Sequence, residues 1–393
     1  MKPPISTRTE LINALRTAAE LEHGIMAQYL FAAYSIKRYT YEGLDPVQLE
    51  HVRRWGSSLT LISRQEMEHL GLALNLLSAI GGTPSFTRPN MPQHPDYYGK
   101  AGIELTLTRA DYDTLCRFQR FESPDDLIEG LKPGEPVDQG EARKWCGRKK
   151  DLKSREQLEA YIEQEEEKRK TPRLAVSAPI LDFGWDSVQE LYQTIREGFE
   201  TLTALMGESN LFVGKPSLQI FGGPTSKQSG TMNDLNQYGV DLIEVNNLAS
   251  ARQAITMILE QGEGIAVNAS YLRWTHFCLF TNIRQGMDDL KLGKIAARPV
   301  VPNPMTRRYP DVAHKQVTML TNGSTLQVAQ LFNESYELML LLLLYLYSDN
   351  VKTQAQVNDL MDAAFFPLMT MFIRPLAEVL TEMPAFENPK DKT

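Results

Sequence analysis

The sequence predicts an all-α protein in which long helices form a bundle, and a proline-free stretch near the N-terminus is the first sign of it. Between Thr9 and Ile36 the chain has no proline and one glycine. Leu15, Glu22 and Tyr29 recur there at seven-residue spacing, which places them on one helix face. A carboxylate therefore interrupts the apolar stripe of a helix expected at about residues 7–37. Glu22 fits either a metal-bridging ligand or a pairing with Arg or His that fixes the helix register.

A second long helix, expected at about residues 46–80, carries an acid and an imidazole on its apolar face. At steps of three and four, that face consists of Trp55, Leu59, Ile62, Glu66, His69, Ala73, Leu76 and Ile80. Burying an unpaired charge costs roughly several kcal/mol, so Glu66 and His69 must be paired or metal-bound. Glu-x-x-His facing a bundle interior is the ligand pattern of di-iron and di-manganese carboxylate proteins. The motif is short and matches by chance when alone, but two adjacent helices that each bury an acid favour a metal.

Further helices follow, separated by long irregular connections. We expect them at about residues 109–121, 186–206, 248–262, 268–285, 325–348 and 354–382. Prolines in residues 84–104 and the many Ser, Asn and Gly in residues 207–247 indicate connections. The helix expected at 268–285 places His276 on its apolar face.

The same pattern divides the chain into four parts. Residues 1–124 should form the first half of the bundle, and residues 181–290 the second half. Residues 125–180 indicate a charged insert or lid, with a highly charged surface helix at 156–170. Residues 291–393 should form a C-terminal helical extension packed on the bundle.

Composition narrows the class of protein and its partners. Apolar residues make up 42% and charged residues 23% of the chain, as is ordinary for a globular protein. The net charge, 41 minus 49 or −8, argues against a nucleic-acid partner. The three cysteines are widely spaced, which argues against a disulfide scaffold, and we expect no signal peptide. The apolar run Leu338–Tyr347 is too short to cross a bilayer, so we expect no membrane partner. These features fit a cytoplasmic protein. We expect a small-molecule partner, and a homo-oligomer is compatible with the sequence.

Several stretches of the sequence, taken together, resemble one known family. In the first half they are Ala19–His23, Tyr29–Leu30, Tyr34–Lys37, Ser63–His69, Asn75–Gly82 and Phe118–Pro124. In the second half they are Ile258–Gly264, Thr275–Phe277 and Phe332–Tyr336. Collectively they resemble the ferritin-like domain of the iminophenyl-pyruvate dimer synthases, and residues 125–178 have no counterpart in that resemblance.

The resemblance implies a ferritin-like four-helix bundle with additional C-terminal helices, long irregular connections and a metal site. The named synthases oxidatively couple two imine forms of an aromatic 2-amino acid in bis-indole pigment pathways. They are far longer than this chain, so the fold and the metal site carry over better than the substrate.

The resemblance also implies a set of metal ligands. These are Glu22, Glu66, His69, Glu197, Glu263 and His276. Glu197 lies off the strongest apolar stripe of its helix, so Glu200 remains a rival, and Glu260 remains beside Glu263 as an acid that could lie outside the ligand shell.

The sequence departs from a symmetric pattern at Arg273, three residues before His276, where a second Glu-x-x-His would have an acid. Arginine cannot bind a metal because it offers only hydrogen-bond donors. Either Glu263 replaces that ligand, or the second metal position is weakened, or Arg273 has a catalytic role in binding a substrate carboxylate.

Carboxylates and imidazoles together form a hard site that suits iron or manganese. The leading hypothesis is a non-haem di-iron, or di-metal, oxidase or oxygenase that uses O2 or peroxide on a small amino-acid-derived or natural-product substrate. Trp55, Tyr29, Trp274 and Phe277 could line an aromatic-accepting pocket, although core packing explains each of them as well. The alternatives are a non-catalytic metal-binding or structural ferritin-like protein, and a buried salt-bridge network without a metal.

Overall fold

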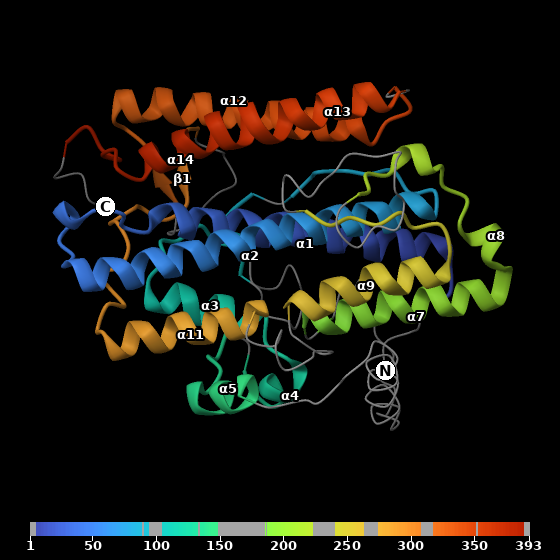
Figure 1. Ribbon diagram of the computed structural model, residues 1–393, viewed down its shortest axis with the longest axis horizontal. Coiled ribbons are helices and arrows are strands. Elements are labelled where there is room, and N and C mark those ends of the chain that lie inside the picture. The colour runs from blue at the N-terminus through green and yellow to red at the C-terminus, as the bar shows by residue number, and fades with distance from the viewer. Residues whose placement is uncertain are drawn as a thin grey trace.

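The computed structural model describes residues 5–88, 90–93, 104–132, 134–147, 185, 187–222, 240–262, 274–307, 317–350 and 353–388, and the statements below concern these residues. They form three helical layers (Figure 1). A long helical pair, α1 (Arg8–Ser35) and α2 (Pro46–Ala79), lies in the middle. Shorter helices cover one face of this pair, and the C-terminal helices cover the other. The fold is therefore all-α, as the sequence predicts.

The ends of the two central helices are set by local sequence. Thr7 and Glu10 form a capping box at the start of α1. Asp45 accepts hydrogen bonds from two backbone amides at the start of α2, and Pro46 occupies the first helical position. Both helices end within two residues of the expected positions. The turn between them contains a short 3-10 helix, η1 (Thr40–Glu42).

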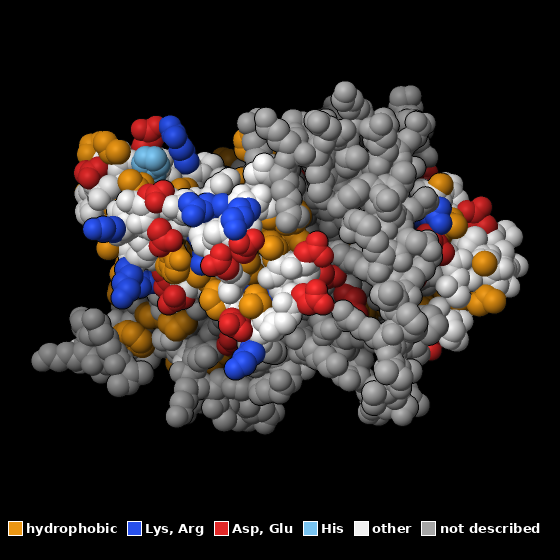
Figure 2. All heavy atoms as spheres, turned by 90° about the horizontal axis from the view of Figure 1, so that it is seen from below, with side chains coloured by type: hydrophobic (Ala, Val, Ile, Leu, Met, Phe, Trp, Pro, Cys, Tyr) orange, Lys and Arg blue, Asp and Glu red, His pale blue; other side chains and the backbone are white. Residues whose placement is uncertain are grey.

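The lower layer holds the rest of the bundle. Helices α7 (Val188–Met206) and α9 (Leu248–Gly262) pack against each other and against α1 and α2, which completes a four-helix bundle. A second pair, α3 (Tyr112–Phe121) and α11 (His276–Asp289), packs beside it. Figure 2 views the underside of this layer, where acidic and basic side chains are interspersed over the described part.

Short helices connect these elements. They are α4 (Asp125–Ile128), α5 (Gln139–Cys146), α8 (Glu208–Leu211) and η3 (Pro216–Leu218). The first two lie in the expected charged insert, and α5 packs on α11. The charged helix expected at 156–170 lies outside the described residues.

One helix start differs from the prediction. Helix α11 begins at His276, with Thr275 as its N-cap, and does not place His276 in the middle of a helix at 268–285. Thr275 accepts a hydrogen bond from the Cys278 amide, as an N-cap does. Residues 263–273 lie outside the described residues.

The C-terminal layer consists of α12 (Gly323–Leu346), α13 (Gln354–Ala363), a π-helical segment η5 (Ala364–Ile373) and α14 (Arg374–Leu380). Two short parallel strands, β1 (Pro304–Met305) and β2 (Thr318–Met319), precede it. By length and composition the run Ala355–Leu380, with a mean hydropathy of 1.4, could cross a membrane. Core helices of soluble proteins meet the same criterion, so this is weak support for a membrane span.

A disulfide joins Cys146 at the end of α5 to Cys278 in the first turn of α11. Their Cα atoms are 5.7 Å apart and the residues are 132 positions apart in the sequence. The adjacent rings of Trp145 and Phe277 meet edge to face, which fixes the same contact between the two helices. The sequence predicts no disulfide scaffold and does not predict this single bond, because the pairing depends on a packing contact that spacing does not reveal.

A substitution at Gly214 tests how closely the chain packs against the C-terminus of α2. The Gly214 amide donates to the Ala79 carbonyl, and a Cβ at this position would lie 1.8 Å from the Ser78 carbonyl oxygen. We expect Gly214→Ala to lower the free energy of unfolding by about 2 kcal/mol or more, since backbone atoms must move. Gly323→Ala is the control, because a Cβ there meets nothing within 4 Å. Urea unfolding checks both, and equal stability of the two variants would contradict the packing described.

Candidate metal centre

Five acidic and imidazole side chains meet in the interior where the bundle adjoins the α3–α11 pair. They are Glu22 from α1, Glu66 and His69 from α2, Glu122 from the C-cap of α3, and His276 from the start of α11. All five are buried, with at most 6% of any residue exposed. Within the part of the chain that the structure describes, Glu66, His69 and His276 offer ligand atoms that all lie within 4.8 Å of one another.

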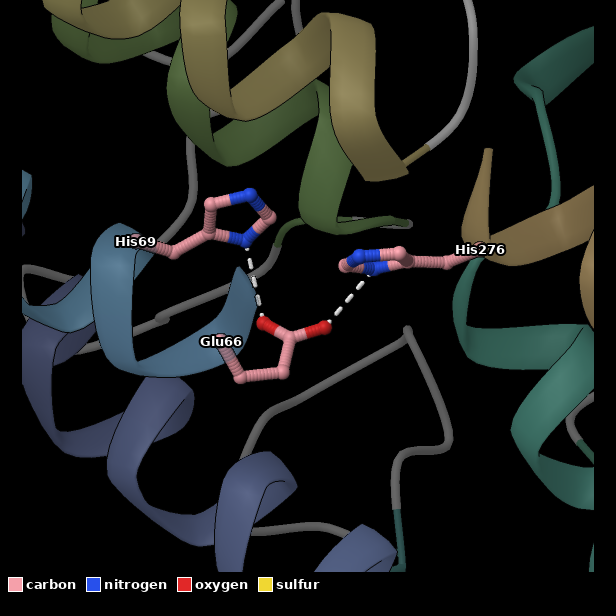
Figure 3. A group of neighbouring side chains, drawn as sticks. All are labelled: Glu66, His69 and His276. Carbon is pink, nitrogen blue, oxygen red and sulfur yellow. Dashed lines mark hydrogen bonds and ion pairs between the residues drawn. The ribbon is translucent and has the colours of Figure 1, made fainter. Parts of the chain in front are cut away.

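Glu66 occupies the centre of this group, between the two imidazoles (Figure 3). Its Oε2 lies 3.0 Å from Nδ1 of His69, and its Oε1 lies 2.8 Å from Nδ1 of His276. One carboxylate therefore faces a different imidazole with each oxygen, which is the arrangement of a bridging ligand.

Two further carboxylates flank Glu66, one beside each imidazole. Oε2 of Glu22 lies 3.8 Å from Nδ1 of His69, and Oε2 of Glu122 lies 3.5 Å from Nδ1 of His276. The group thus has two similar halves, each with one imidazole and one flanking carboxylate, and both halves share Glu66.

Buried tyrosines hold the outer oxygens of the flanking carboxylates. Tyr192 donates to Oε1 of Glu22 at 2.6 Å, and Tyr29 donates to Oε1 of Glu122 at 2.5 Å. Burial, followed by the neighbouring carboxylates, raises the pKa of both phenols well above the usual value, so both remain donors. Each flanking carboxylate keeps its second oxygen for the centre.

Glutamine side chains fix the outer nitrogens of the imidazoles. Nε2 of His69 lies 3.0 Å from Oε1 of Gln261, whose amide nitrogen donates to Glu68 at 3.0 Å. That second bond orients the amide, so its oxygen accepts from His69 Nε2–H. Nε2 of His276 similarly lies 3.2 Å from Oε1 of Gln65. With one proton held on Nε2, each Nδ1 can give its lone pair to a cation that replaces the proton there, which is how outer partners prepare metal-binding histidines.

The electrostatics of the group reflect three carboxylates in a dry interior. Burial and then Glu66 raise the pKa of Glu22 well above its usual value. Burial raises the pKa of Glu66 as well, but His276 and His69 more than offset this and hold that pKa far below the usual range. Burial lowers the pKa of His276, whereas Glu66 and Glu122 raise it to about 10. The cluster therefore favours added positive charge, which protons or a cation can supply.

The donor set fits a metal cation. Oε1 of Glu66 and Nδ1 of His276 are 2.8 Å apart, yet neither buried atom has a hydrogen-bond partner. The surrounding cavity has a volume of about 10 Å³, and its walls include Glu22, Glu66, His69 and Glu122. This volume suits an ion and not an aromatic molecule. Mixed carboxylate and imidazole donors suit iron or manganese.

The structure brings together four of the six residues expected to bind metal: Glu22, Glu66, His69 and His276. Glu197 is exposed on α7 and does not join them, because it lies on the opposite side of the helix from Tyr192 and Ile195. Its rival Glu200 forms ion pairs with Arg252 at 2.7 Å and Arg196 at 3.5 Å. Neither Glu197 nor Glu200 therefore joins the group around Glu66 in this structure.

Other expected site residues lie elsewhere or outside the described part of the chain. Glu263 and Arg273 lie outside the described residues, and Glu260 is half-buried on α9. Among the aromatic residues, Tyr29 contacts the centre through Glu122, and Trp274 is 51% exposed. Phe277 packs in a separate small cluster with Trp145.

Glu122 is the carboxylate that sequence reasoning missed. It follows an amphipathic helix, in the stretch Phe118–Pro124, and no periodic stripe includes it because it caps the helix. A Cβ on Gly262 would lie 3.2 Å from its Oε2, so the glycine that ends α9 leaves room for it. The sequence feature that could have identified Glu122 is its place in the stretch Phe118–Pro124, which resembles the family, directly after the buried Phe121.

A helical bundle that buries carboxylates and histidines contributed by several helices defines the carboxylate–histidine class of four-helix proteins. A family model described as Ferritin-like matches residues 15–285. The chain belongs to this ferritin-like family.

Two curated relatives are similar over nearly the whole chain. Dichlorochromopyrrolate synthase of Lentzea aerocolonigenes is 25% identical, with 97% of this chain and 35% of the relative covered. The 2-imino-3-(indol-3-yl)propanoate dimerase of Chromobacterium violaceum is 24% identical, with 97% and 33% covered. The chain thus spans about a third of each relative's length, and the expected resemblance is confirmed. A solved ferritin-like protein from Caulobacter vibrioides is 17% identical with a TM-score of 0.46, and 96% of each chain is covered.

Glu66→Gln tests whether the centre binds metal. A ligand that binds only the folded chain stabilises it by mass action, so Fe²⁺ or Mn²⁺ at about a hundredfold excess over Kd should raise the Tm measurably. For a chain of this length the scaling gives a rise of about 3 °C. We expect the variant to lose this rise while its helical content stays the same, because an amide cannot bridge as a carboxylate does. Calorimetry under anaerobic conditions measures the shift, and an unchanged rise in the variant would place the metal elsewhere.

Glu122→Gln and Glu197→Gln form a matched pair that separates the structural assignment from the sequence-based one. We expect Glu122→Gln to weaken metal binding by about tenfold or more, because Glu122 faces His276. Glu197→Gln should bind metal as the unaltered protein does. Equilibrium dialysis with elemental analysis measures affinity and stoichiometry, and the reverse order of effects would refute the assignment.

Proposed function

We propose that this chain is a metal-dependent oxidoreductase whose centre holds iron, with manganese as the alternative metal. The central observation is Glu66, whose two oxygens face the Nδ1 atoms of His69 and His276. The two similar halves around it support two metal positions, one beside each imidazole. Glu22 and Glu122 would complete them.

Each residue around the centre has a separate task. Glu66 holds the two halves at a fixed separation, and the flanking carboxylates offset cationic charge. Tyr29 and Tyr192 prevent those carboxylates from rotating away, because each tyrosine hydroxyl donates a short hydrogen bond to the outer oxygen of one carboxylate. The apolar walls exclude bulk water, which protects reactive species from hydrolysis. When bound, iron would supply the capacity to exchange electrons with O2 or peroxide.

The names of the relatives support a substrate class. One is a dimerase of 2-imino-3-(indol-3-yl)propanoate, and the other is a synthase of dichlorochromopyrrolate. We propose that this chain takes an aromatic 2-imino acid, or a similar amino-acid-derived compound, and couples two molecules. Two C–H bonds break, one C–C bond forms, and the two electrons and two protons released reduce one hydrogen peroxide to two waters.

Arg273 would bind the substrate carboxylate in this proposal. Arginine forms paired hydrogen bonds with a carboxylate through its planar fork, which lysine lacks. Its place three residues before His276 in the sequence puts it close to the centre along the chain. Its position in space lies outside the described residues.

The experiment is a coupling assay on metal-loaded protein. A 2-imino acid is generated in place from L-tryptophan or L-phenylalanine by an amino-acid oxidase, which also supplies peroxide. We expect a dimer with two hydrogens fewer than two monomers, detected by mass spectrometry. Formation should require metal, should fall by about a hundredfold or more in Glu66→Gln, and should be unaffected in Glu197→Gln.

Other outcomes would refute this function. Metal bound at the centre without oxidation of any aromatic imino acid would favour the alternative, a non-catalytic metal-binding ferritin-like protein. A chain that binds neither metal would support a buried ion-pair network.

A further inference from the structure

A large cavity separates the central helical pair from the C-terminal layer. Its volume is about 1610 Å³, far above that of the space at the metal centre. Its floor includes Met26, Leu30 and Leu74, and its roof includes Leu340 and Phe365. Figure 1 shows α12, α13 and α14 above the α1–α2 pair on the side away from α7 and α9.

The walls of this cavity are mostly apolar. Met, Leu and Phe side chains from α1, α2, α12 and η5 form much of them. Water in contact with so much apolar surface is unfavourable, whereas an apolar ligand would remove that surface from water. The shape and chemistry of the walls therefore suit a large hydrophobic molecule.

A polar cluster lies on the cavity wall between the floor and the roof. The Tyr336 hydroxyl on α12 lies 2.6 Å from Nε2 of His23 on α1, and Arg88 donates a hydrogen bond to the same hydroxyl. The Phe332 ring stacks on Tyr336 with centroids 6.2 Å apart. This cluster gives the apolar chamber a place where a polar group of a ligand can be bound.

The charged side chains of the wall favour an anion. Arg298 is paired with Glu42 at 2.6 Å and with Glu382 at 2.9 Å, so here one cation faces two acids. The other charged residues of the described wall are three cations and one acid: Lys37, Arg88, Arg307 and Glu337. Over the whole described wall, four cations face three acids. A positive excess of one charge beside an apolar chamber favours an amphiphile with a negative head.

We propose that this cavity is a binding site for an apolar molecule that carries one carboxylate, with the carboxylate near Arg88 and the apolar body against α12. The site is distinct from the metal centre. Glu22 and Glu66 face the lower layer, whereas their neighbours His23 and Met67 line the cavity. Acyl acids and aromatic acids share the required chemistry.

The test is a fluorescence titration with cis-parinaric acid, a fluorescent acyl acid, on the full chain with and without metal. We expect saturable binding that chelator does not abolish. Competition by oleate or by indole-3-acrylate then identifies the acyl or the aromatic source. Methyl oleate should compete roughly tenfold less well than oleate, because it lacks the charge.

Two adjacent leucines on α12 provide matched variants. Leu340 lines the cavity, whereas Leu341 is 56% exposed on the outer side of the helix and is not part of the wall. Leu340→Trp should fill the chamber and weaken parinarate binding by roughly tenfold or more, and Leu341→Trp should leave it unchanged. Helical content and Tm confirm that both fold, and Leu343→Trp, also in the wall, substitutes if Leu340→Trp does not.

Arg88→Gln tests the head group separately, and it should abolish the preference for oleate over its ester. The proposal is overturned if binding does not saturate, if neither acid competes, or if oleate and methyl oleate compete equally. It is also overturned if Leu341→Trp weakens binding as much as the cavity variants do. None of these results depends on whether the metal centre oxidises a substrate.

Discussion

The pairing of Glu66 with two imidazoles is the interaction on which the arrangement of the lower layer depends. A carboxylate in a dry interior is costly unless it is compensated, and here His69 comes from the same helix while His276 comes from α11. Glu122, at the end of α3, contacts the same group through His276. With Glu22 of α1, which lies 3.8 Å from His69, four separate elements therefore converge because their polar side chains satisfy one another.

Outer contacts make this centre rigid. The two tyrosines and two glutamines that surround it each use one hydrogen bond to fix one ligand, and the ligand keeps its other atom for the centre. Glu68 then fixes Gln261 in turn. Near His276, the disulfide between Cys146 and Cys278 and the contact of Trp145 with Phe277 hold the start of α11 against α5. The position of His276 thus depends on contacts outside the four-helix bundle.

The α1–α2 pair serves two environments at once, because the 3.6-residue helical repeat turns neighbouring residues to different faces. Glu22 faces the polar centre and His23 the apolar chamber, and Glu66 and Met67 divide in the same way. An ordinary amphipathic helix has one buried face. These two helices are buried on two, which explains why α1 and α2 contain so few exposed residues near their middles.

The sequence by itself indicated the helices and four of the five side chains of the centre. Periodicity located α1 and α2 to within two residues, and it identified Glu22, Glu66 and His69 because each interrupts an apolar stripe. Only the tertiary structure decided the rest. Glu122 lies at a helix cap, outside any repeat, and Cys146 meets Cys278 across 132 residues. Glu197 is exposed although its stretch resembles a ligand-bearing helix, because the packing of α7 turns Tyr192 inward instead. The periodicity of apolar residues along the sequence indicates which face of a helix is buried. The residues that this face contacts depend on how distant segments of the chain pack.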